Sequence, residues 1–483
     1  MFGKSILLWV TRFVRVSSMA SIAFAIVPVA SAQATTAHNE QVLYSFQGLP
    51  NDGYQPVGAV VFDAAGNLYG ATAEGGSSSC PSIQQCGTVY ELSPPAVKGE
   101  PWTETVLYVF KGNKFNDGTS PYGGLVIDSA GNLYGTTGYG GTGNCVLLGI
   151  LVGCGTVYEL SPPAQKGGTW TEQVLYSFPT PEEGYAPVGD LVFDSSGNLY
   201  GATAFGGGYG TTCDEFYQYC GAIFELSPPQ QKGGSWSEQT LYGFKGTARG
   251  VLTGDGGSPN GGLRLDASGN IYGTTMDGGF AVGVCGGTWQ GGPGCGTVFE
   301  LVRPRDKGGA WTENVLHIFL DNSEDGATPY SGITFDAELS SIYGTTGGGG
   351  PTQYGTVYRL SPPSGNSLSW TETLLFSFQQ NNSEGAIPTG SLVLGPGSTL
   401  YGTTSWGGGD QPDGTVFELS ASAGGKSEIF NLDVLHTFEG PPDGQWPSAS
   451  LVRRAGSLYS TTPDGGTGVC GYTGCGTIFE VEP

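Results

Sequence analysis

One acidic motif, [DE]-G-x-x-P, occurs seven times along the chain. Carboxylates that gather at one place can bind a cation such as Ca²⁺, or give a channel a negative potential. An acid before Gly and Pro can also accept backbone N–H groups and hold a turn, which would explain its presence in every copy. Both interpretations stay open: no cofactor is predicted, and calcium is the ion that these acids could bind. The acids are Asp52, Asp117, Glu183, Asp255, Asp325, Glu384 and Asp443.

A second repeated position varies from copy to copy, which is where a repeat protein is expected to carry specificity. It is the residue just before a G-G pair: Glu74, Tyr139, Phe205, Asp277, Gly348, Trp406 and Asp464. Aromatic rings and carboxylates together are suited to stacking on sugar rings and to accepting hydroxyl hydrogen bonds. The six that are not glycine are predicted to bind a glycan or an extracellular protein. Tyr217, Tyr219 and Trp289 would enlarge the aromatic surface. The alternative is a solvated rim with incidental aromatics.

Ten cysteines form five local pairs, each between that G-G and the following G-T. The two copies without cysteines have shorter loops there, so each pair is predicted to be a disulfide across a loop neck. Such small rings contribute roughly 2 to 2.5 kcal/mol each in the chain-entropy model. Zinc is the alternative, but the spacing varies and no C-x-x-C or partner His is present. The pairs are Cys80 and Cys86, Cys145 and Cys154, Cys213 and Cys220, Cys285 and Cys295, and Cys470 and Cys475.

Histidine is scarce, which argues against nucleophilic catalysis by a His-activated Ser or Cys. His38 lies in the N-terminal tail, while His317 and His436 replace Tyr in a V-L-Y-x-F pattern and are interpreted as packing substitutions. No catalytic residue is predicted. An enzyme would have to be a hydrolase or lyase that acts on polysaccharide with a carboxylate pair or a channel-bound calcium ion.

Short strands are predicted to position the acids, the residues before G-G and the cysteines. The string N-L-Y-G-T-T recurs every 58 to 72 residues, is preceded by an apolar run, and is followed by G-T-V-[YF]-E-L and W-T-E-x-V-L-Y-x-F. β-Branched and aromatic residues bracketed by D-[AS]-[AS]-G-N and S-P-P turns indicate four strands per copy. Seven such units predict a seven-bladed β-propeller, an all-β fold. The tyrosines of the string are Tyr69, Tyr134, Tyr200, Tyr272, Tyr343, Tyr401 and Tyr459.

The two ends of the chain predict how the ring closes. Residues 42–46 read as a fourth strand with no unit before it, and residues 476–481 as a third strand with no fourth after it. The N-terminal strand is therefore expected to complete the last blade, which removes open sheet edges. A linear solenoid is the alternative. The expected blades span residues 57–110, 123–178, 189–244, 261–319, 331–378, 390–438, and 449–483 plus 40–47.

A propeller places the acidic turns and the cysteine loops on one face, because alternate connections of an antiparallel blade share a face. If the first strands line the axis, the seven turn acids are expected around the mouth of the central channel. Repeated, mutually capped acids there would favour a binding module, and unrepeated polar groups converging in one pocket would favour an enzyme. A scaffold would show neither.

The repeated N-L-Y-G-T-T and G-T-V-F-E-L strings resemble the Gloeo/Verruco tandem repeats of bacterial proteins over almost the whole mature chain. The resemblance implies a secreted or surface protein of unestablished activity, often with a C-terminal anchor. Here Pro483 follows the last strand directly, so anchoring by that route is not expected.

Composition agrees with export of an all-β chain. Residues 1–32 have a basic start, an apolar run and an A-S-A site, and are predicted to be a signal peptide, with an uncleaved anchor as the alternative. Residues 33–483 would then form one domain in the periplasm or outside the cell, monomeric and without a membrane span. The 86 Gly and 30 Pro argue against long helices. A net charge of −24 argues against nucleic acid as a partner.

Overall fold

The computed structural model describes most of the chain after residue 38. The described residues are 39–50, 52–76, 86–147, 149–165, 167–207, 220–231, 233–246, 254–279, 294–365, 369–379, 383–408, 413–422 and 430–483. Residues 38–483 form one compact unit. The predicted signal peptide, residues 1–32, lies outside the described residues.

The first blade shows how the repeat folds. Strands β3 (Val61–Phe62), β4 (Leu68–Thr72), β6 (Thr88–Ser93) and β7 (Thr103–Val109) pair antiparallel in that order. The D-A-A-G-N turn joins the first two strands: the Asp63 carboxylate accepts the backbone N–H groups of Gly66 and Asn67, and Gly66 has a φ of 100°. β4 is buried along its whole length, so it forms the middle of the blade.

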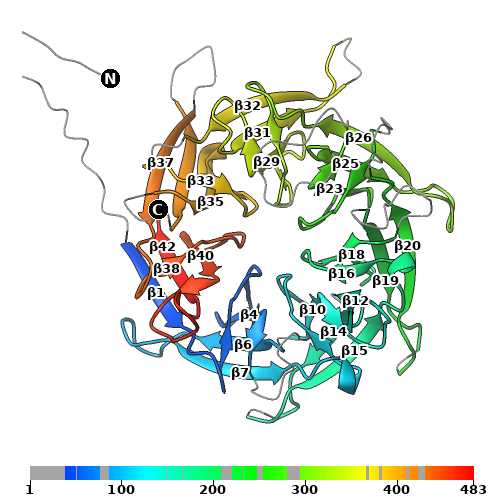
Figure 1. Cartoon of the computed structure of the whole chain (residues 1–483), viewed down its shortest axis with the longest axis vertical. Helices are drawn as coiled ribbons and strands as arrows, with labels where there is room; N and C mark the ends of the chain where they lie inside the picture. The colour runs from blue at the N-terminus through cyan, green and yellow to red at the C-terminus, as the bar shows by residue number, and fades with distance from the viewer. Residues whose placement is uncertain are drawn as a thin grey trace, which may run out of the picture. The chain divides into compact units, whose positions relative to one another are not determined.

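Six further blades repeat this strand order around a common axis (Figure 1). Their strands, from the first to the fourth, are β9 (Val126–Ile127), β10 (Leu133–Thr137), β14 (Thr156–Ser161) and β15 (Thr171–Ser177); β17 (Val192–Phe193), β18 (Leu199–Phe205), β19 (Ala222–Ser227) and β20 (Ser237–Gly243); β22 (Arg264–Leu265), β23 (Ile271–Thr275), β25 (Thr297–Val302) and β26 (Thr312–Ile318); β28 (Thr334–Phe335), β29 (Ile342–Thr346), β31 (Thr356–Ser361) and β32 (Thr371–Ser377); β34 (Val393–Leu394), β35 (Leu400–Trp406), β36 (Thr415–Ala421) and β37 (Phe430–Thr437); and β39 (Val452–Arg454), β40 (Ser457–Thr462), β42 (Thr477–Glu482) and β1 (Asn39–Ser45). The fold is a seven-bladed β-propeller, as predicted.

The N-terminal strand closes the ring. β1 pairs antiparallel with β42, with Val42 opposite Phe479, and becomes the outermost strand of blade seven. In Figure 1 the blue strand lies beside the red one. The predicted closure is therefore confirmed.

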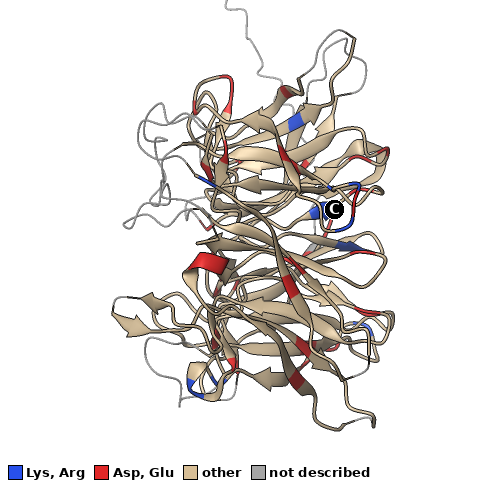
Figure 2. Ribbon diagram, turned by 90° about the vertical axis from the view of Figure 1, so that its right-hand side faces the viewer, with Lys and Arg blue, Asp and Glu red and all other residues tan. Residues whose placement is uncertain are grey.

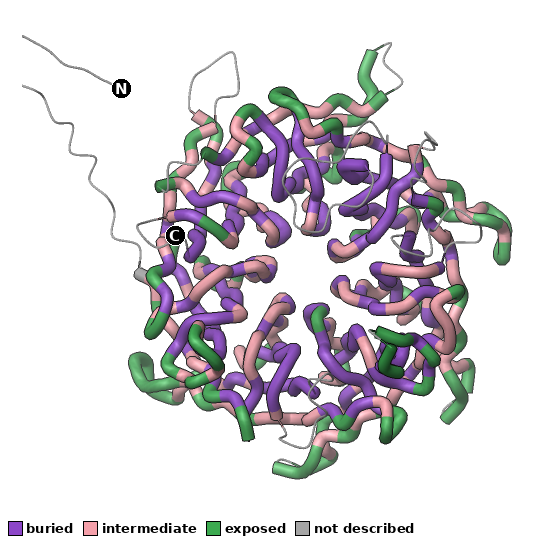
Figure 3. The backbone as a smooth tube through the Cα atoms, viewed as in Figure 1, coloured by how far each residue is buried: buried purple, intermediate pink, exposed green. Residues whose placement is uncertain are grey.

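The hydrophobic core lies within and between the blades, where an aromatic ring that follows each fourth strand meets the third strand of the next blade. Phe46 packs edge-on against Tyr90, with 5.1 Å between the ring centroids. The same contact recurs at all seven blade interfaces, so each blade needs its neighbour to bury its face. Figure 3 shows the buried backbone inside the blades and the exposed backbone on the outer rim. The other six pairs are Phe110–Tyr158, Phe178–Phe224, Phe244–Phe299, Phe319–Tyr358, Phe378–Phe417 and Phe438–Phe479.

A short ladder on one face links the [DE]-G-x-x-P turn of each blade to the residue before G-G. In blade one β2 (Gly53–Tyr54) pairs with β5 (Glu74–Gly75). The equivalent pairs are β8 (Gly118–Thr119) with β11 (Tyr139–Gly140), β16 (Tyr185–Pro187) with β18, β21 (Gly256–Gly257) with β24 (Asp277–Gly278), β27 (Gly326–Ala327) with β30 (Gly348–Gly349), β33 (Ala386–Pro388) with β35, and β38 (Gly444–Gln445) with β41 (Asp464–Gly465).

The residue before each motif proline ties its blade to the preceding one. Its N–H donates to a carbonyl of the preceding blade over 2.8 to 3.2 Å, and its own φ is between 53° and 58°. A positive φ costs a non-glycine residue on the order of 1 kcal/mol, which the hydrogen bonds that it makes offset. The donor–acceptor pairs are Gln55–Cys475, Ser120–Cys86, Ala186–Cys154, Ser258–Cys220, Thr328–Cys295, Ile387–Tyr354 and Trp446–Asp413.

Acidic residues are spread over strands and turns around the ring, and basic residues are few (Figure 2), in keeping with 42 acidic and 18 basic residues in the chain. The helical elements of the described residues are three 3-10 turns, η1 (Asn113–Phe115), η2 (Pro181–Glu183) and η3 (Pro396–Ser398). Across the same residues, no helix has the length and apolar character that crossing a bilayer requires.

Candidate functional site

The seven turn acids do not surround the central channel, so that expectation is wrong. The Asp52 carboxylate accepts hydrogen bonds from the N–H groups of Gly53 and Gln47 and from the hydroxyl group of Tyr44. Tyr44 belongs to β1, an outermost strand. The chain crosses the face from an outer strand to the next inner strand, and the acid lies where this crossing begins. The turn-stabilising interpretation is confirmed at Asp52, and Asp117, Asp325 and Asp443 accept the equivalent backbone bonds.

Each turn acid shares its blade interface with two other side chains. One comes from the Tyr position of V-L-Y-x-F in the preceding blade, and the other is four residues before that position in the following blade. At the interface of blades seven and one these are Tyr44, Asp52 and Glu104. The other sets are Tyr108, Asp117 and Glu172; Tyr176, Glu183 and Glu238; Tyr242, Asp255 and Glu313; His317, Asp325 and Glu372; Phe376, Glu384 and Leu432; and His436, Asp443 and Glu40.

Burial makes the glutamates of these sets weak acids. Desolvation, followed by the charge of Asp52, raises the pKa of Glu104 to about 8. Desolvation, followed by the charge of Asp255, raises the pKa of Glu313 to about 8. Carboxyl groups this close favour one shared proton, because two charges cannot both be stabilised there. Ionisation of both carboxyl groups is therefore unfavourable at these interfaces, and the protonated glutamate is the form that the folded chain favours.

His317 and His436 do more than fill space. Each ring packs edge-on against a phenylalanine, Phe319 or Phe438, as the packing interpretation predicts. Each Nε2 also lies 3.1 Å from a carboxylate oxygen of the turn acid, the place that the tyrosine hydroxyl takes in other blades. The substitution keeps both the ring contact and the polar contact.

The residues before G-G occupy equivalent places at the seven short ladders and do not form one cluster. Glu74, Asp277 and Asp464 are buried, and Asp464 accepts a hydrogen bond from Thr473. Phe205 stacks on Tyr185. Trp406 is exposed over 46% of its surface. Gly348 brings no side chain, and Tyr139 is half-buried. Their predicted role in ligand binding stays a prediction, and Tyr217, Tyr219 and Trp289 lie outside the described residues.

A pocket of about 110 Å³ lies on the axis of the ring and is lined by all seven blades. Its walls come from the three residues that follow each motif proline, at the start of the innermost strands. Most of these residues are small: a Cβ on Gly58 would lie 2.6 Å from the Gly123 carbonyl oxygen, so the segments pack closely around the axis. The larger side chains that line it are Val57, Tyr122, Val188, Asp190, Asn260, Tyr330 and Thr389.

Tyr122 and Tyr330 are the two aromatic residues of the pocket, and each covers a glycine of its own blade. A Cβ on Gly138 would lie 2.8 Å from the Tyr122 ring, and one on Gly347 would lie 2.5 Å from the Tyr330 ring. Blades one and three, which have Val57 and Val188 at the tyrosine position, have alanine at the glycine position. Glycine therefore occurs beneath each of these two tyrosine rings, where a Cβ atom would clash with the ring.

The tyrosines also connect the pocket with the predicted ligand-binding positions. Burial, the neighbouring Tyr139 and then Glu74 raise the pKa of Tyr122. Burial and then Asp277 raise the pKa of Tyr330. Both hydroxyl groups therefore remain protonated donors near neutral pH.

Asp190 brings the one carboxylate among the lining residues. It holds the third place after the motif proline, where the other blades have Ala, Gly or Ser. Its Oδ1 accepts the N–H group of Gly124, in the neighbouring blade, over 2.7 Å. Sequence reasoning missed this residue because the segment after the proline carries no recognised motif. The signal was present in the sequence as one acid at a position where the other six blades have Ala, Gly or Ser.

The cysteine loops lie on the face that carries the short ladders. The disulfides Cys145–Cys154 and Cys470–Cys475 are confirmed. Cys86, Cys220 and Cys295 are disulfide-bonded as well, while Cys80, Cys213 and Cys285 lie outside the described residues. Inside the Cys145–Cys154 loop, β12 (Val146–Leu147) and β13 (Ile150–Leu151) form a hairpin whose four aliphatic side chains are exposed. A stapled apolar hairpin of this kind is suited to contact with another molecule.

A second, wider groove of about 470 Å³ lies along the outer strand of blade one, and its wall includes Tyr108, Lys111, Trp170 and Glu172. Tyr, Trp and Glu recur at the same places in other blades, so the groove reflects the shared repeat. The axial pocket, in contrast, is lined by residues that differ between blades.

Comparison with known proteins assigns the repeat. The Gloeobacter/Verrucomicrobia repeat matches residues 148–367 and 283–483, which together cover more than half of the chain. The chain belongs to this repeat family. The matched segments include the acidic turns and the G-G positions of blades three to seven. None of the curated proteins matches the chain.

Several solved structures are similar to this Gloeobacter/Verrucomicrobia repeat protein at low sequence identity. A PQQ-bound aldose sugar dehydrogenase from Streptomyces coelicolor is 12% identical, with 92% of this chain and 98% of that chain covered and a TM-score of 0.41. A gluconolactonase from Xanthomonas campestris is 12% identical, with 68% and 78% covered and a TM-score of 0.34. A chain of the mitotic checkpoint complex is 9% identical, with 96% and 99% covered and a TM-score of 0.47.

Proposed function

We propose that this protein is an exported binding module that recognises a glycan through the axial pocket and the surrounding face with the disulfide-stapled loops. The observation that carries the proposal is that residues repeated in the blades and residues particular to one or two blades lie in different places. Shared acids are engaged in turns and blade interfaces. Unshared side chains, among them Tyr122, Asp190 and Tyr330, meet at the axis.

The chemistry of the pocket suits a polyhydroxylated ligand. Tyrosine rings offer apolar faces with hydroxyl donors, Asn260 offers an amide, and Asp190 offers a carboxylate acceptor. Hydroxyl groups of a sugar need both donors and acceptors at close range, with an apolar surface for the C–H face of the ring. The exposed Trp406 on the same face would extend contact to a longer chain.

Glycan-array binding followed by calorimetry tests the proposal. Tyr122→Ala and Asp190→Asn are each expected to weaken binding about tenfold or more, as loss of an aromatic or charged contact at the centre of an interface does. Trp406→Ala is expected to weaken binding to oligosaccharides more than to monosaccharides. Val97→Ala, which truncates an exposed side chain in the turn between β6 and β7, outside the proposed binding surface, is the control and should bind as wild type. Absence of binding to every glycan, or unchanged binding by both pocket variants, would contradict the proposal.

A hydrolase or lyase is the second candidate, favoured by Asp190 as an unrepeated carboxylate in a pocket. Hydrolysis by two carboxyl groups needs a partner acid, and the residues that line the pocket include only Asp190. Binding is therefore the better-supported function. Release of reducing ends from a bound polysaccharide, abolished by Asp190→Asn, would favour the enzyme.

A further inference from the structure

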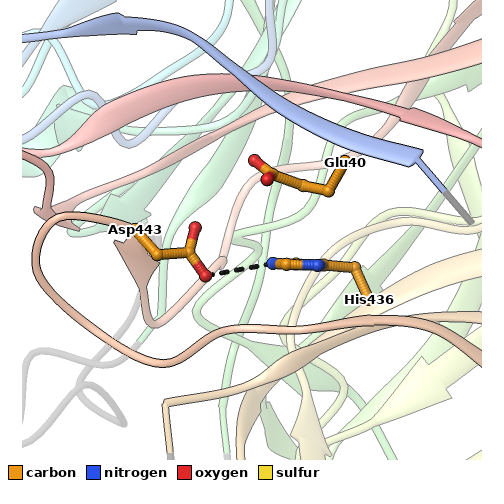
Figure 4. A group of neighbouring side chains, drawn as sticks. All are labelled: Glu40, His436 and Asp443. Atoms are coloured by element: carbon orange, nitrogen blue, oxygen red, sulfur yellow. Dashed lines mark hydrogen bonds and ion pairs between the residues drawn. The ribbon is translucent and has the colours of Figure 1, made fainter.

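Histidine takes the place of the interface tyrosine at two blade interfaces, and one of these lies between blades six and seven. His436 comes from β37, Asp443 from the turn that leads into β38, and Glu40 from β1. Figure 4 shows the carboxylates of Glu40 and Asp443 near the same end of the imidazole ring. One atom from each side chain can be chosen so that all three lie within 4.8 Å of one another, and His436 Nε2 lies 3.1 Å from Asp443 Oδ2.

The polar atoms of this group are not all satisfied by the protein. Glu40 Oε1 is buried and has no hydrogen-bond partner among the described residues. Glutamates of other interfaces share this property, so the unpartnered oxygen alone is not distinctive. The imidazole distinguishes this interface from five of the others, because four have a tyrosine hydroxyl group in its place and one has Phe376, whereas the interface of blades four and five has His317.

We propose that Glu40, His436 and Asp443 bind a divalent transition-metal ion, with Zn²⁺ as the ion that fits best. Two carboxylates and a neutral imidazole give the set a charge that a divalent cation neutralises. A nitrogen ligand favours Zn²⁺ over Ca²⁺, which prefers oxygen, and three protein ligands leave a fourth position for water. Zn²⁺ bonds of about 2.0 to 2.2 Å keep tetrahedral ligand atoms about 3.3 Å apart, so these side chains need to approach by at most about 1.5 Å.

The ion would have a defined structural role. Glu40 reaches this interface only because β1 closes the ring, and His436 belongs to the neighbouring blade. A bound ion would therefore connect the N-terminal strand to blade six, in addition to its pairing with β42. The site is separate from the axial pocket and does not depend on the proposed glycan binding.

The chain itself offers a matched comparison. His317, Asp325 and Glu372 are the same residue types at the interface of blades four and five, with a His317 Nε2 to Asp325 Oδ1 distance of 3.1 Å. Among the described residues, only the Glu40 set has its three ligand atoms within 4.8 Å. Phe376 takes the histidine position in blade five, so the fold tolerates phenylalanine at this place.

The experiment uses tag-free protein from residue 33 onward, stripped with a chelator and dialysed against Zn²⁺. Elemental analysis is expected to find one Zn²⁺ per wild-type chain, and Zn²⁺ at about 100 times its Kd is expected to raise the Tm by about 3 °C, whereas Ca²⁺ should not. His436→Phe should reduce Zn²⁺ affinity at least tenfold, and the control His317→Phe should not reduce it. If His436→Phe fails to fold, the Zn²⁺ affinity of Glu40→Gln tests the proposal instead, because this substitution keeps the shape of the side chain. Absence of bound Zn²⁺ in the wild type, or wild-type affinity in Glu40→Gln, would overturn the proposal.

Discussion

The backbone N–H of Gln55 donates a hydrogen bond to the carbonyl oxygen of Cys475 over 3.1 Å. This bond joins the first blade to the last, and Cys475 is at the same time one end of a disulfide. In five blades the acceptor of this bond is the second cysteine of a loop, and in the other two it is Tyr354 or Asp413 at the end of a short loop. The disulfides therefore fix the carbonyl groups that hold neighbouring blades together, as well as the loop necks.

Removal of one disulfide should weaken its blade interface. Cys470→Ala with Cys475→Ala is expected to lower the free energy of unfolding by about 2 kcal/mol, the loop-closure value for so small a ring. Denaturant unfolding measures this. Proteolysis should at the same time become faster near residue 55, and an unchanged unfolding midpoint would contradict the prediction. Titration of the unreduced, unfolded wild-type protein should find no free thiol, which also tests the three disulfides not fully described.

Ring closure can be weakened with a single side chain. Phe46 is fully buried against Tyr90 of blade one. Phe46→Ala is expected to cost about 3 to 5 kcal/mol, the usual range for a buried phenylalanine. Thermal unfolding measures the loss. The control is Gln47→Ala, because the Gln47 side chain is exposed. Equal stability of the two variants would argue against β1 as a structural strand of blade seven.

The carboxyl pairs at the blade interfaces predict a pH dependence. The pKa of Glu104 is about 8 in the folded chain and 4.5 without perturbation, so the folded state binds its proton more tightly. The free energy of unfolding should therefore fall as the pH rises from about 4.5 to about 8, on the order of 1 kcal/mol per interface after solvent screening is discounted. Unfolding measured from pH 5 to pH 9 tests this. Glu104→Gln should reduce the fall, while the exposed loop variant Glu100→Gln should leave it unchanged.

The ring positions of the two pocket tyrosines, Tyr122 and Tyr330, should depend on the glycine that each ring covers. In Gly347→Ala the new methyl group would lie 2.5 Å from the Tyr330 ring, so the ring must move and ligand binding should weaken. A second change, Tyr330→Val, should relieve the strain, because blades one and three combine valine and alanine at these places. Thermal unfolding of the single and double variants, analysed as a double-mutant cycle, measures the coupling. Additive effects would show that the two positions are independent.

The sequence predicted the architecture well because the repeat carries redundant information. Each turn type appears several times, and the unpaired strands at the two ends fit together, so the ring and its closure by β1 followed. The radial position of the turn acids within the ring was harder to predict. Asp52 and its equivalents were assigned to the channel because the radial position of a turn depends on which strands it connects, and the Tyr44–Asp52 contact lies at an outer strand.

The pocket residues could not be found by motif. Tyr122, Asp190 and Tyr330 follow the motif proline in segments whose shared feature is small size. Their importance comes from meeting at the axis, which only the closed ring brings about. Glu40 and His436 illustrate the same limit, since they lie far apart in the sequence and meet where β1 returns to blade seven.

The pairing of β1 with β42 also has a consequence for the order of folding. Asn39 lies opposite Glu482, so β1 cannot pair in this way until β42, more than 400 residues later in the chain, has been synthesised. Contacts of such high sequence separation form slowly, and until then both partners expose unpaired strand edges. Completion of this ring therefore comes late, because β1 can take its place in blade seven only after β42 has been synthesised.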